Sequence, residues 1–196
     1  MSHSLDAAAL DQIFTKAKTH SHWLNKDVSD ALLSEIYDLC KMAPTSANCQ
    51  PIRIIFVKTR DAKEKLRPAL FEGNLEKTMA APVTAIFAYD MEFYNKLDVT
   101  FPHVDAKPWF TQTENDTFIH AFRNGTLQAA YFILAARAKG LGCGPMSGFN
   151  ATMVDEIFLA GTKYRSNFLC NLGYGDETKA YNRLPRLPFD EVCTIV

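Results

Sequence analysis

The sequence predicts one domain that combines helices with a few short strands. At 196 residues the chain has the length of an ordinary single domain, which buries roughly 70% of its unfolded surface on folding. Apolar residues recur at helical spacing in several segments, whereas residues 52–57, 83–89 and 166–174 are short β-prone runs. No internal repeat, low-complexity tract or linker interrupts the pattern, so residues 1–196 are expected to form one domain.

The first quarter of the chain is expected to contain two helices and a strand. A first helix, capped by Ser4, should stop near Thr19. A second helix, capped by Ser29, should run up to Pro44, because proline ends a helix and serine is a preferred cap. Residues 52–57 then form the first strand.

The middle of the chain changes from regular to irregular structure. A charged helix is expected over residues 61–70, a short helical turn over 74–80, and a buried strand over 83–89. Periodicity then fails between residues 93 and 118, where aromatic residues and prolines are mixed. Long irregular segments of this kind often serve as lids over a site.

The longest helix is expected over residues 117–139, and it has no charge between Arg123 and Arg137. It is too short and too polar to span a bilayer, which needs about 20 apolar residues. A helix without charges is buried all round, and the small residues of this one favour packing against another subunit.

The last third of the chain is expected to be compact until residue 174 and irregular after it. Residues 140–144 should end the long helix and lead into a loop over 145–148. A helix capped by Asn150 should reach residue 158 before the last strand, and the tail from residue 176 is broken by prolines.

Composition excludes several classes of protein. The 21 Lys and Arg balance 22 Asp and Glu, so the chain has no excess of positive charge that would attract nucleic acid or an anionic membrane. The five cysteines show no C-x-x-C spacing, which speaks against zinc, and their odd number fits a reducing compartment. Asp6 and Asp11 stand where a signal peptide would be basic and then apolar, so a cytoplasmic location is expected.

Five polar segments lie at the boundaries of the expected elements. The loop from Pro44 to Pro51 holds hydroxyl and amide side chains between two prolines, and suits a ribityl chain or a phosphate, although such loops usually only cap a helix. One bound cofactor would explain this loop together with four other segments: Lys18–His22, Asn74 with Lys77, Pro145–Gly148, and Arg183 with Arg186.

Together these segments resemble the nitroreductase superfamily of flavoproteins over essentially the whole chain. Pro44–Asn48 with Gln50 and Pro51 is similar to that family's flavin loop, and Pro145–Gly148 to the segment at the isoalloxazine edge. Within the superfamily, the chain resembles the malonic semialdehyde reductase (3-hydroxypropionate dehydrogenase) type of pyrimidine degradation. That resemblance is carried by Thr19–Trp23, Ala43–Cys49, Ala81–Ala85, Phe122–Asn124 and Gly144–Phe149.

The resemblance implies a fold and an activity. The fold would be an α+β sandwich with a mostly antiparallel sheet flanked by helices, built as an intertwined homodimer with two FMN sites at the interface. The activity would be an NAD(P)H oxidoreductase that relays hydride through flavin N5 to a small acceptor, here malonic semialdehyde. No Ser-His-Asp or paired-carboxylate pattern competes with this interpretation, because the cofactor carries the chemistry.

The resemblance also implies roles for individual residues around FMN. The cofactor-binding residues would be Lys18, Thr19, His20 and Ser21 at the phosphate and ribityl chain, Pro44, Thr45, Ser46 and Asn48 from the partner subunit, Asn74 and Lys77 at N1 and O2, Pro145, Met146, Ser147 and Gly148 at N5 and O4, and Arg183 and Arg186 at the phosphate. Lys18 and His22 stand where many members have stronger basic residues, so we expect the two tail arginines to supply the remaining charge.

The acceptor side is less defined. His103 and Trp109 lie in the irregular segment, and Arg123 could pair with a substrate carboxylate, so these three are the substrate candidates. The alternatives are a broad nitro- or quinone reductase that stacks its acceptor on aromatic rings, and a flavin-binding protein without dehydrogenase activity. His20 and His22 lack a third ligand, so no metal is expected, and the choice between NADH and NADPH stays open.

Overall fold

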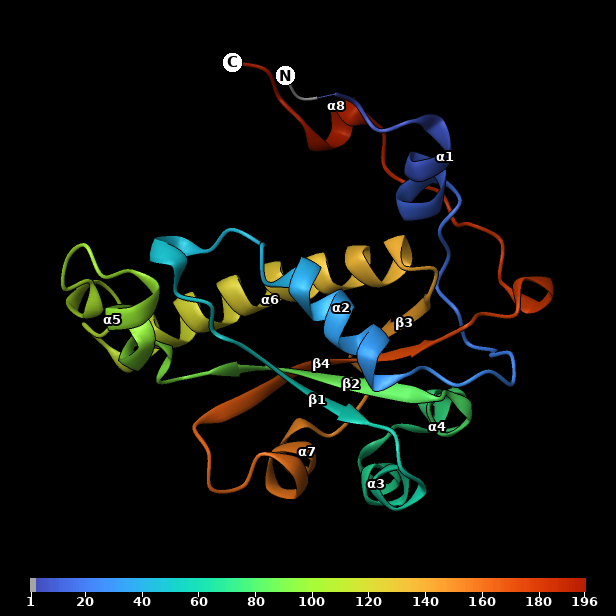
Figure 1. Cartoon of the computed structure of the whole chain (residues 1–196), viewed down its shortest axis with the longest axis horizontal. Helices are drawn as coiled ribbons and strands as arrows, with labels where there is room; N and C mark the ends of the chain where they lie inside the picture. The colour runs from blue at the N-terminus through green and yellow to red at the C-terminus, as the bar shows by residue number, and fades with distance from the viewer. Residues whose placement is uncertain (1–2) are drawn as a thin grey trace.

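The protein forms an antiparallel sheet that is covered by helices on both faces (Figure 1). A computed structural model describes residues 3–196 of the chain. Within those residues the sheet has four strands in the order β1 (Ile52–Val57), β2 (Val83–Asp90), β4 (Tyr164–Gly173) and β3 (Gly142–Met146). Every neighbouring pair is antiparallel. The α+β sandwich with an antiparallel sheet is therefore confirmed.

Two groups of helices cover the two faces of the sheet (Figure 1). Helices α2 (Asp30–Cys40) and α6 (Glu114–Ala138) pack on one face, against Phe87 and Leu172. Helices α3 (Arg60–Leu66), α4 (Glu72–Ala80) and α7 (Ala151–Phe158) lie on the other, where Ile86 and Leu169 point. Successive side chains of a strand point to opposite faces, so β2 is buried along its whole length.

Helix caps follow the expected pattern with one exception. The side chain of Ser29 accepts from the Leu32 N–H at the start of α2, and Asn150 caps α7 in the same way, as predicted. The first helix is capped by Asp6 and not by Ser4. It runs as α1 (Ala7–Leu10) and a π-helical stretch to Thr15, and it ends short of the predicted Thr19 because Thr19 pairs with Cys143 of β3.

Three other elements differ from the sequence prediction. Helix α4 begins at Glu72, so Gly73 lies inside the helix and not before it. Helix α6 begins at Glu114, where Thr113 caps it. Residues 142–146 form β3, which the glycine-rich sequence does not indicate, because their backbone pairs with β4 from Gly173 to Leu169.

The small residues of α6 pack within the chain. Ala129, Ala135 and Ala136 are buried against the sheet, and a Cβ on Gly125 would lie only 3.2 Å from the Cβ of Tyr89. The predicted use of these residues at a subunit interface is therefore wrong for most of them, since the sheet of the same chain covers them. The opposite face of α6 exposes the large apolar side chains of Phe122, Leu127 and Tyr131.

The irregular segment and the tail contain only short helical turns. Between residues 93 and 118, α5 (Leu97–Thr100) and two 3₁₀ turns enclose a small aromatic core around Phe93 and Phe110. The tail from residue 176 contains one 3₁₀ turn and α8 (Phe189–Val192), which lies beside α1 on an arm that projects from the sheet (Figure 1). In the described part of the chain, no helix has the length and apolar character needed to cross a bilayer.

Candidate functional site

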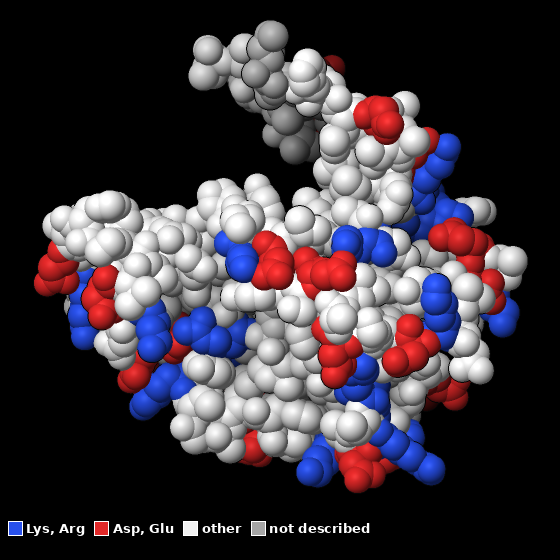
Figure 2. Space-filling view, in the orientation of Figure 1, with Lys and Arg blue, Asp and Glu red and all other residues white. Residues whose placement is uncertain are grey.

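A cavity of about 800 Å³ lies between the projecting arm and the body of the molecule. Figure 2 shows the gap beneath the arm, with Lys and Arg side chains next to Asp and Glu side chains where the arm joins the body. Segments that are far apart in the sequence meet here, and they come from four of the five polar segments. The predicted site residues that line the cavity are Lys18, Thr19, His20, Ser21, Lys77, Pro145, Arg183 and Arg186.

Backbone pairing holds the segment from Thr19 to Trp23 at this cavity. Thr19 forms a bridge with Cys143, and the His20 N–H donates to the Cys143 carbonyl at 3.0 Å. Trp23 forms a second bridge with Gly175, just beyond β4. The segment therefore lies along the edge of the sheet beside β3, and its side chains are positioned by strands and not by a free loop.

The imidazole of His20 is almost fully buried in this wall. A Cβ on Gly142 or on Gly175 would collide with the ring, so both positions require glycine for steric reasons. The ring Nε2 lies 3.3 Å from Glu177 Oε1. Burial lowers the pKa of His20, and the positive charge of Lys18 adds to this effect, although Glu177 opposes it. His20 is therefore mostly neutral near pH 7.

Helix α4 brings Asn74 and Lys77 beside the Pro145–Gly148 segment. Asn74 Nδ2 donates to the Gly148 carbonyl at 2.8 Å, and a Cβ at Gly148 would collide with that amide. The indole of Trp23 donates to the Lys77 carbonyl at 3.1 Å, which ties α4 to the neighbouring wall. The Lys77 side chain borders the cavity with Pro145.

Met146 and the tail arginines are placed differently from the other predicted residues. The Met146 side chain is buried in the core between the sheet and α7, and its sulfur accepts from the Thr78 hydroxyl at 3.4 Å. Arg183 Nη2 donates to three carbonyls of residues 14–17, and Arg186 Nη1 donates to carbonyls of the tail. Both arginines line the cavity while also holding the arm together.

The predicted loop from Pro44 to Pro51 borders a different pocket, of about 860 Å³. Pro44, Thr45 and Ser46 line it together with Arg123 and Phe122 of α6. The Asn48 side chain donates to the Thr100 carbonyl at 2.8 Å, which ties the loop to the end of α5. The loop is thus a defined structure, but it does not meet the first cavity within one chain.

Backbone strain in this loop is held by contacts beyond it. The backbones of Ala47, Asn48 and Gln50 have φ of +47°, +49° and +42°. Residues other than glycine rarely adopt this left-handed region. Conformations of this kind persist only when neighbouring structure fixes them, and they gather at ligand sites. The strain marks the loop as a candidate binding segment.

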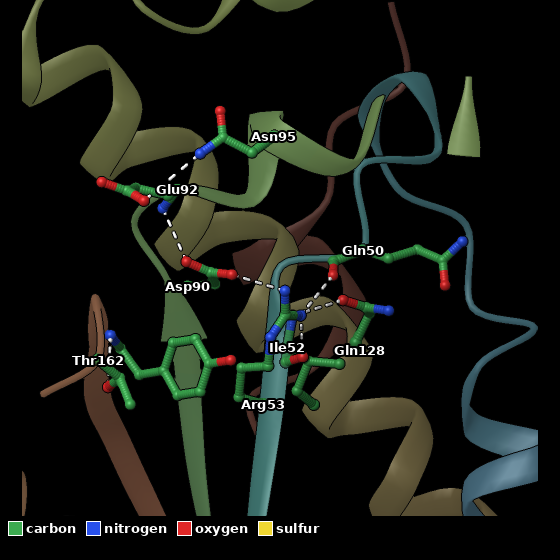
Figure 3. Close-up of polar contacts among 9 residues, drawn as sticks. Gln50, Ile52, Arg53, Asp90, Glu92, Asn95, Gln128 and Thr162 are labelled. Atoms are coloured by element: carbon green, nitrogen blue, oxygen red, sulfur yellow. Dashed lines mark hydrogen bonds and ion pairs between the residues drawn. The ribbon is translucent and has the colours of Figure 1, made fainter. Parts of the chain in front are cut away.

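Arg53 fixes the exit of the loop, as Figure 3 shows. Its Nη1 donates to the carbonyls of Gln50 and Ile52, and its Nη2 donates to Asp90 Oδ2 at 2.6 Å. Gln128 Oε1 of α6 accepts from the Ile52 N–H at 3.1 Å. Sequence reasoning missed these supports, because their partners are 37 and 76 residues away.

The loop pocket lies at the middle of α6, and the cavity beneath the arm lies at the C-terminal end of this helix. Arg123 lines the loop pocket and Arg137 lines the cavity beneath the arm. Fourteen residues of α-helix separate them, which corresponds to about 21 Å. Within one chain, the Pro44–Pro51 loop therefore does not line the cavity that holds the Lys18–Ser21 segment.

The three substrate candidates are dispersed. Phe101 stacks edge-on with His103 at 5.5 Å and contacts Trp109 at 6.1 Å between ring centroids, so these two candidates share an exposed aromatic cluster. Arg123 lies in the loop pocket with Phe122. None of the three lines the cavity beneath the arm within the described residues.

Arg137 is a charged cavity residue that sequence reasoning missed. It lies at the end of α6 and borders the cavity with Lys18 and Lys77. The sequence signal was a charged residue that ends a long uncharged stretch, but such a residue is ordinarily a solvated helix end. Only the fold shows that this end points at the cavity.

The comparisons with known proteins agree with this geometry. The nitroreductase family model matches residues 15–174, so the chain belongs to the nitroreductase family. A protein of Stenotrophomonas maltophilia, provisionally named an NADH dehydrogenase/NAD(P)H nitroreductase, is 57% identical over 195 residues, which cover the whole of both chains. Membership therefore extends over almost the full sequence.

Two solved structures share the fold at low sequence identity. A provisionally assigned nitroreductase of Bacillus subtilis superposes with a TM-score of 0.88 at 21% identity, covering 97% of this chain and 100% of that one. A provisionally assigned nitroreductase of Exiguobacterium sibiricum, solved in complex with FMN, superposes with a TM-score of 0.82 at 17% identity, covering 100% of this chain and 99% of that one.

Proposed function

We propose that this protein is an FMN-dependent NAD(P)H oxidoreductase that reduces a small organic acceptor. The observation that carries the proposal is the cavity beneath the arm, where Lys18–Ser21, Lys77, Pro145 and the tail arginines meet as one binding site would require. Family membership, the name of the Stenotrophomonas relative and the FMN in the Exiguobacterium structure support the same activity.

The donors around the cavity fit a phosphorylated flavin. One end carries hydroxyls and positive charges, Thr19, Ser21, Lys18 and Arg137, which suit a ribityl phosphate. One buried side-chain donor at this end, Arg137 Nε, has no hydrogen-bond partner within residues 3–196. Buried N–H groups normally have partners, so a ligand that brings acceptors to the Arg137 guanidinium would complete this wall.

Bound FMN supplies the hydride carrier between nicotinamide and acceptor. The chain then has to orient the ring and stabilise negative charge on it. We assign the charge to Lys77, whose ammonium borders the cavity on α4, and the orientation to Asn74, which holds the Gly148 carbonyl. Backbone N–H groups near Ser147 and Gly148 would contact the other edge of the ring.

The complete site is proposed to form in a homodimer. The loop residues Thr45, Ser46 and Asn48 do not line the cavity of their own chain, and Arg123 beside the loop is about 21 Å along α6 from Arg137 at the cavity. A second copy that presents its loop to this cavity would close the site. Support comes from apolar side chains that one chain leaves exposed, including Leu184 at 76%, Leu187 at 70% and Phe189 at 60% on the arm.

Malonic semialdehyde is the acceptor that we propose first, with nitroaromatics and quinones as the alternative. Arg123 in the loop pocket could pair with the carboxylate of a small aldehyde acid, and it would reach the cavity of the partner together with the loop. Phe122 in the same pocket, and the exposed Trp109 of the aromatic cluster, would instead favour a flat aromatic acceptor.

We place the protein in the cytoplasm.

The test uses the full-length protein reconstituted with FMN. We expect a yellow dimer by size-exclusion chromatography with light scattering, and oxidation of NADH or NADPH that accelerates when an acceptor is added. Malonic semialdehyde and a nitroaromatic are compared as acceptors at equal concentrations, and the larger kcat/KM identifies the class. A colourless monomer that stays colourless after incubation with FMN would reject the proposal.

A further inference from the structure

Arg137 occupies an unusual position among the cations of the cavity. It belongs to the last turn of α6, a helix of 25 residues that is packed on the sheet for most of its length. Lys18 precedes the segment paired with β3, and Arg183 and Arg186 lie on the exposed arm. The guanidinium of Arg137 is therefore the one carried by the most rigid element at this site.

Its hydrogen bonds leave part of the guanidinium unused. Arg137 Nη1 donates to the Ile13 carbonyl at 3.2 Å, which ties α6 to the first helical segment. The buried Nε has no partner in the part of the chain that the structure describes. An arginine N–H without an acceptor is costly when it is shielded from water, because it loses hydration without compensation.

The surroundings of Arg137 are polar and positively charged. It shares the cavity with Lys18 and His20, and a smaller adjoining pocket with the same two residues and Glu177. The charges of Arg137 and Lys18 both disfavour protonation of His20, so all three side chains lie within electrostatic reach of one another. Glu177 is the acidic neighbour, 3.8 Å from Lys18 Nζ, and its side chain is 69% exposed.

The tail arginines have other partners. Arg183 Nη2 donates to the carbonyls of Phe14, Thr15 and Ala17, at the end of the first helical segment. Arg186 Nη1 donates to the carbonyls of Leu184 and Pro185. A phosphomonoester carries about −1.5 to −2 charges at neutral pH, and Lys18 alone does not balance it.

We infer that Arg137, together with Lys18, holds the terminal phosphate of the flavin cofactor, with the Arg137 guanidinium donating to a phosphate oxygen. This rests on the proposed function, and it assigns a phosphate-selecting role to a residue at the end of α6. Two fixed charges match a phosphate dianion, and a planar guanidinium offers adjacent N–H donors to its oxygens. His20 stays neutral beside them and completes the wall.

A purely structural role is the competing explanation. Arg137 could serve only to hold the first helical segment through Ile13, while Gln12 contacts the Arg137 carbonyl from the same segment. Loss of a structural arginine would weaken the binding of every flavin alike. Loss of a phosphate ligand would weaken FMN and leave riboflavin, which lacks the phosphate, unchanged.

The experiment measures both ligands by quenching of flavin fluorescence on the flavin-free, full-length protein. The variants are Arg137→Met, which keeps the length of the side chain, and Arg137→Lys, which keeps the charge. The control is Lys139→Met, which removes a positive charge two residues further on, from a side chain that pairs with Glu35 outside the cavity. Circular dichroism and thermal unfolding confirm that each variant is folded.

We expect Arg137→Met to lose about 10- to 100-fold in FMN affinity with riboflavin affinity unchanged. Arg137→Lys should recover part of the loss, and Lys139→Met should bind both flavins as the wild type does. Equal losses for FMN and riboflavin, or no loss for either, would overturn the role of Arg137. Should Arg137→Met fail to fold, Arg137→Lys with an unchanged ratio of FMN to riboflavin affinity would also overturn it. Failure of the wild type to bind either flavin would instead reject the proposed function.

Discussion

The Ser46 N–H donates to the side-chain oxygen of Asn124 at 2.9 Å, across 78 residues of sequence. Asn124 is buried in α6, and its amide nitrogen donates to the His120 carbonyl one turn earlier. A single side chain on the longest helix therefore fixes the start of the strained loop that lines the second pocket. Asn124 couples the stability of this loop to the core of the protein.

Replacement of Asn124 by alanine is expected to loosen the Pro44–Pro51 loop. The Ser46 N–H would lose its acceptor, which costs about 1–3 kcal/mol in a partly buried position. Thermal unfolding should show that loss, and FMN affinity should fall in the dimer if the loop contacts the cofactor. Asn124→Asp keeps an oxygen that accepts from Ser46 but loses the amide that donates to the His120 carbonyl, so it should preserve only one of the two contacts. Equal stability of the alanine variant and wild type would contradict the coupling.

Lys77→Ala is expected to slow the reduction of bound flavin by NAD(P)H by about 10- to 100-fold, because negative charge that develops on the ring loses its counter-charge. Stopped-flow bleaching of the flavin absorbance under anaerobic conditions measures this step. Lys65→Ala, on an exposed position of α3, is the matched control and should bleach at the wild-type rate. An unchanged rate for Lys77→Ala would reject the assigned role.

Local patterns in the sequence predicted the elements that they determine. Strand 52–57 has the expected bounds, and the caps Ser29 and Asn150 are confirmed, because capping depends on hydrogen bonds three residues apart. Strand β3 was missed, because Gly142 and Gly144 have low strand propensity and form a strand only through pairing with β4.

The sequence predicted which segments form the site, but not how individual side chains are arranged around it. Polar residues at element boundaries, together with the family resemblance, identified Lys18–Ser21 and Lys77, which do meet at one cavity. Nothing in the residues themselves could show that Arg137 points into this cavity or that Met146 faces the core. Both facts depend on how α6 and β3 are rotated against the sheet, which long-range packing decides.

Gly175→Ala is expected to destabilise the wall of the cavity. An added Cβ would collide with the buried ring of His20, and crowding of this kind typically costs about 1–3 kcal/mol. In the background of His20→Ala the same substitution should cost less, because the ring that it meets is gone. Urea unfolding of the four proteins gives the coupling energy. If the two substitutions change the free energy of unfolding additively, the ring of His20 is not what excludes a side chain at position 175.

Gly73→Ala is the matched control for that experiment. Gly73 lies inside α4, and a Cβ added there would have no heavy atom within 4 Å beyond its own helix backbone and chain neighbours. Alanine should therefore raise stability by up to about 1 kcal/mol, because glycine is a poor helix former. A fall in stability in the same urea measurements would mean that the space around α4 is more crowded than the structure shows.

Lys63 lies buried beneath α4, where its ammonium donates to the Thr78 carbonyl at 2.8 Å and to the Thr84 hydroxyl at 2.5 Å. Thr84 in turn donates to Asn171 Oδ1 at 2.7 Å, and the amide of Asn171 donates to the Thr78 hydroxyl at 3.1 Å. Burial lowers the pKa of Lys63 from its ordinary 10.5 to about 7.

This shift predicts a stability that rises with pH above neutrality. Between about pH 7 and pH 10.5 the unfolded chain keeps the Lys63 proton while the folded chain has lost it, so unfolding becomes less favourable by up to about 1.4 kcal/mol per pH unit. Lys63→Met removes this contribution, whereas Lys65→Met on the exposed side of α3 keeps it. Urea unfolding at pH 7.0 and 8.5 measures the effect. Buried thiols such as Cys49, whose pKa burial raises to about 11, begin to oppose the rise near pH 8.5, where thiols of the unfolded chain lose their protons, so the difference between wild type and Lys63→Met gives the contribution of Lys63. If the free energy of unfolding depends on pH in the same way for wild type and Lys63→Met, Lys63 stays charged in the folded protein. Its hydrogen bonds to Thr78 and Thr84 would then replace the lost contacts with water.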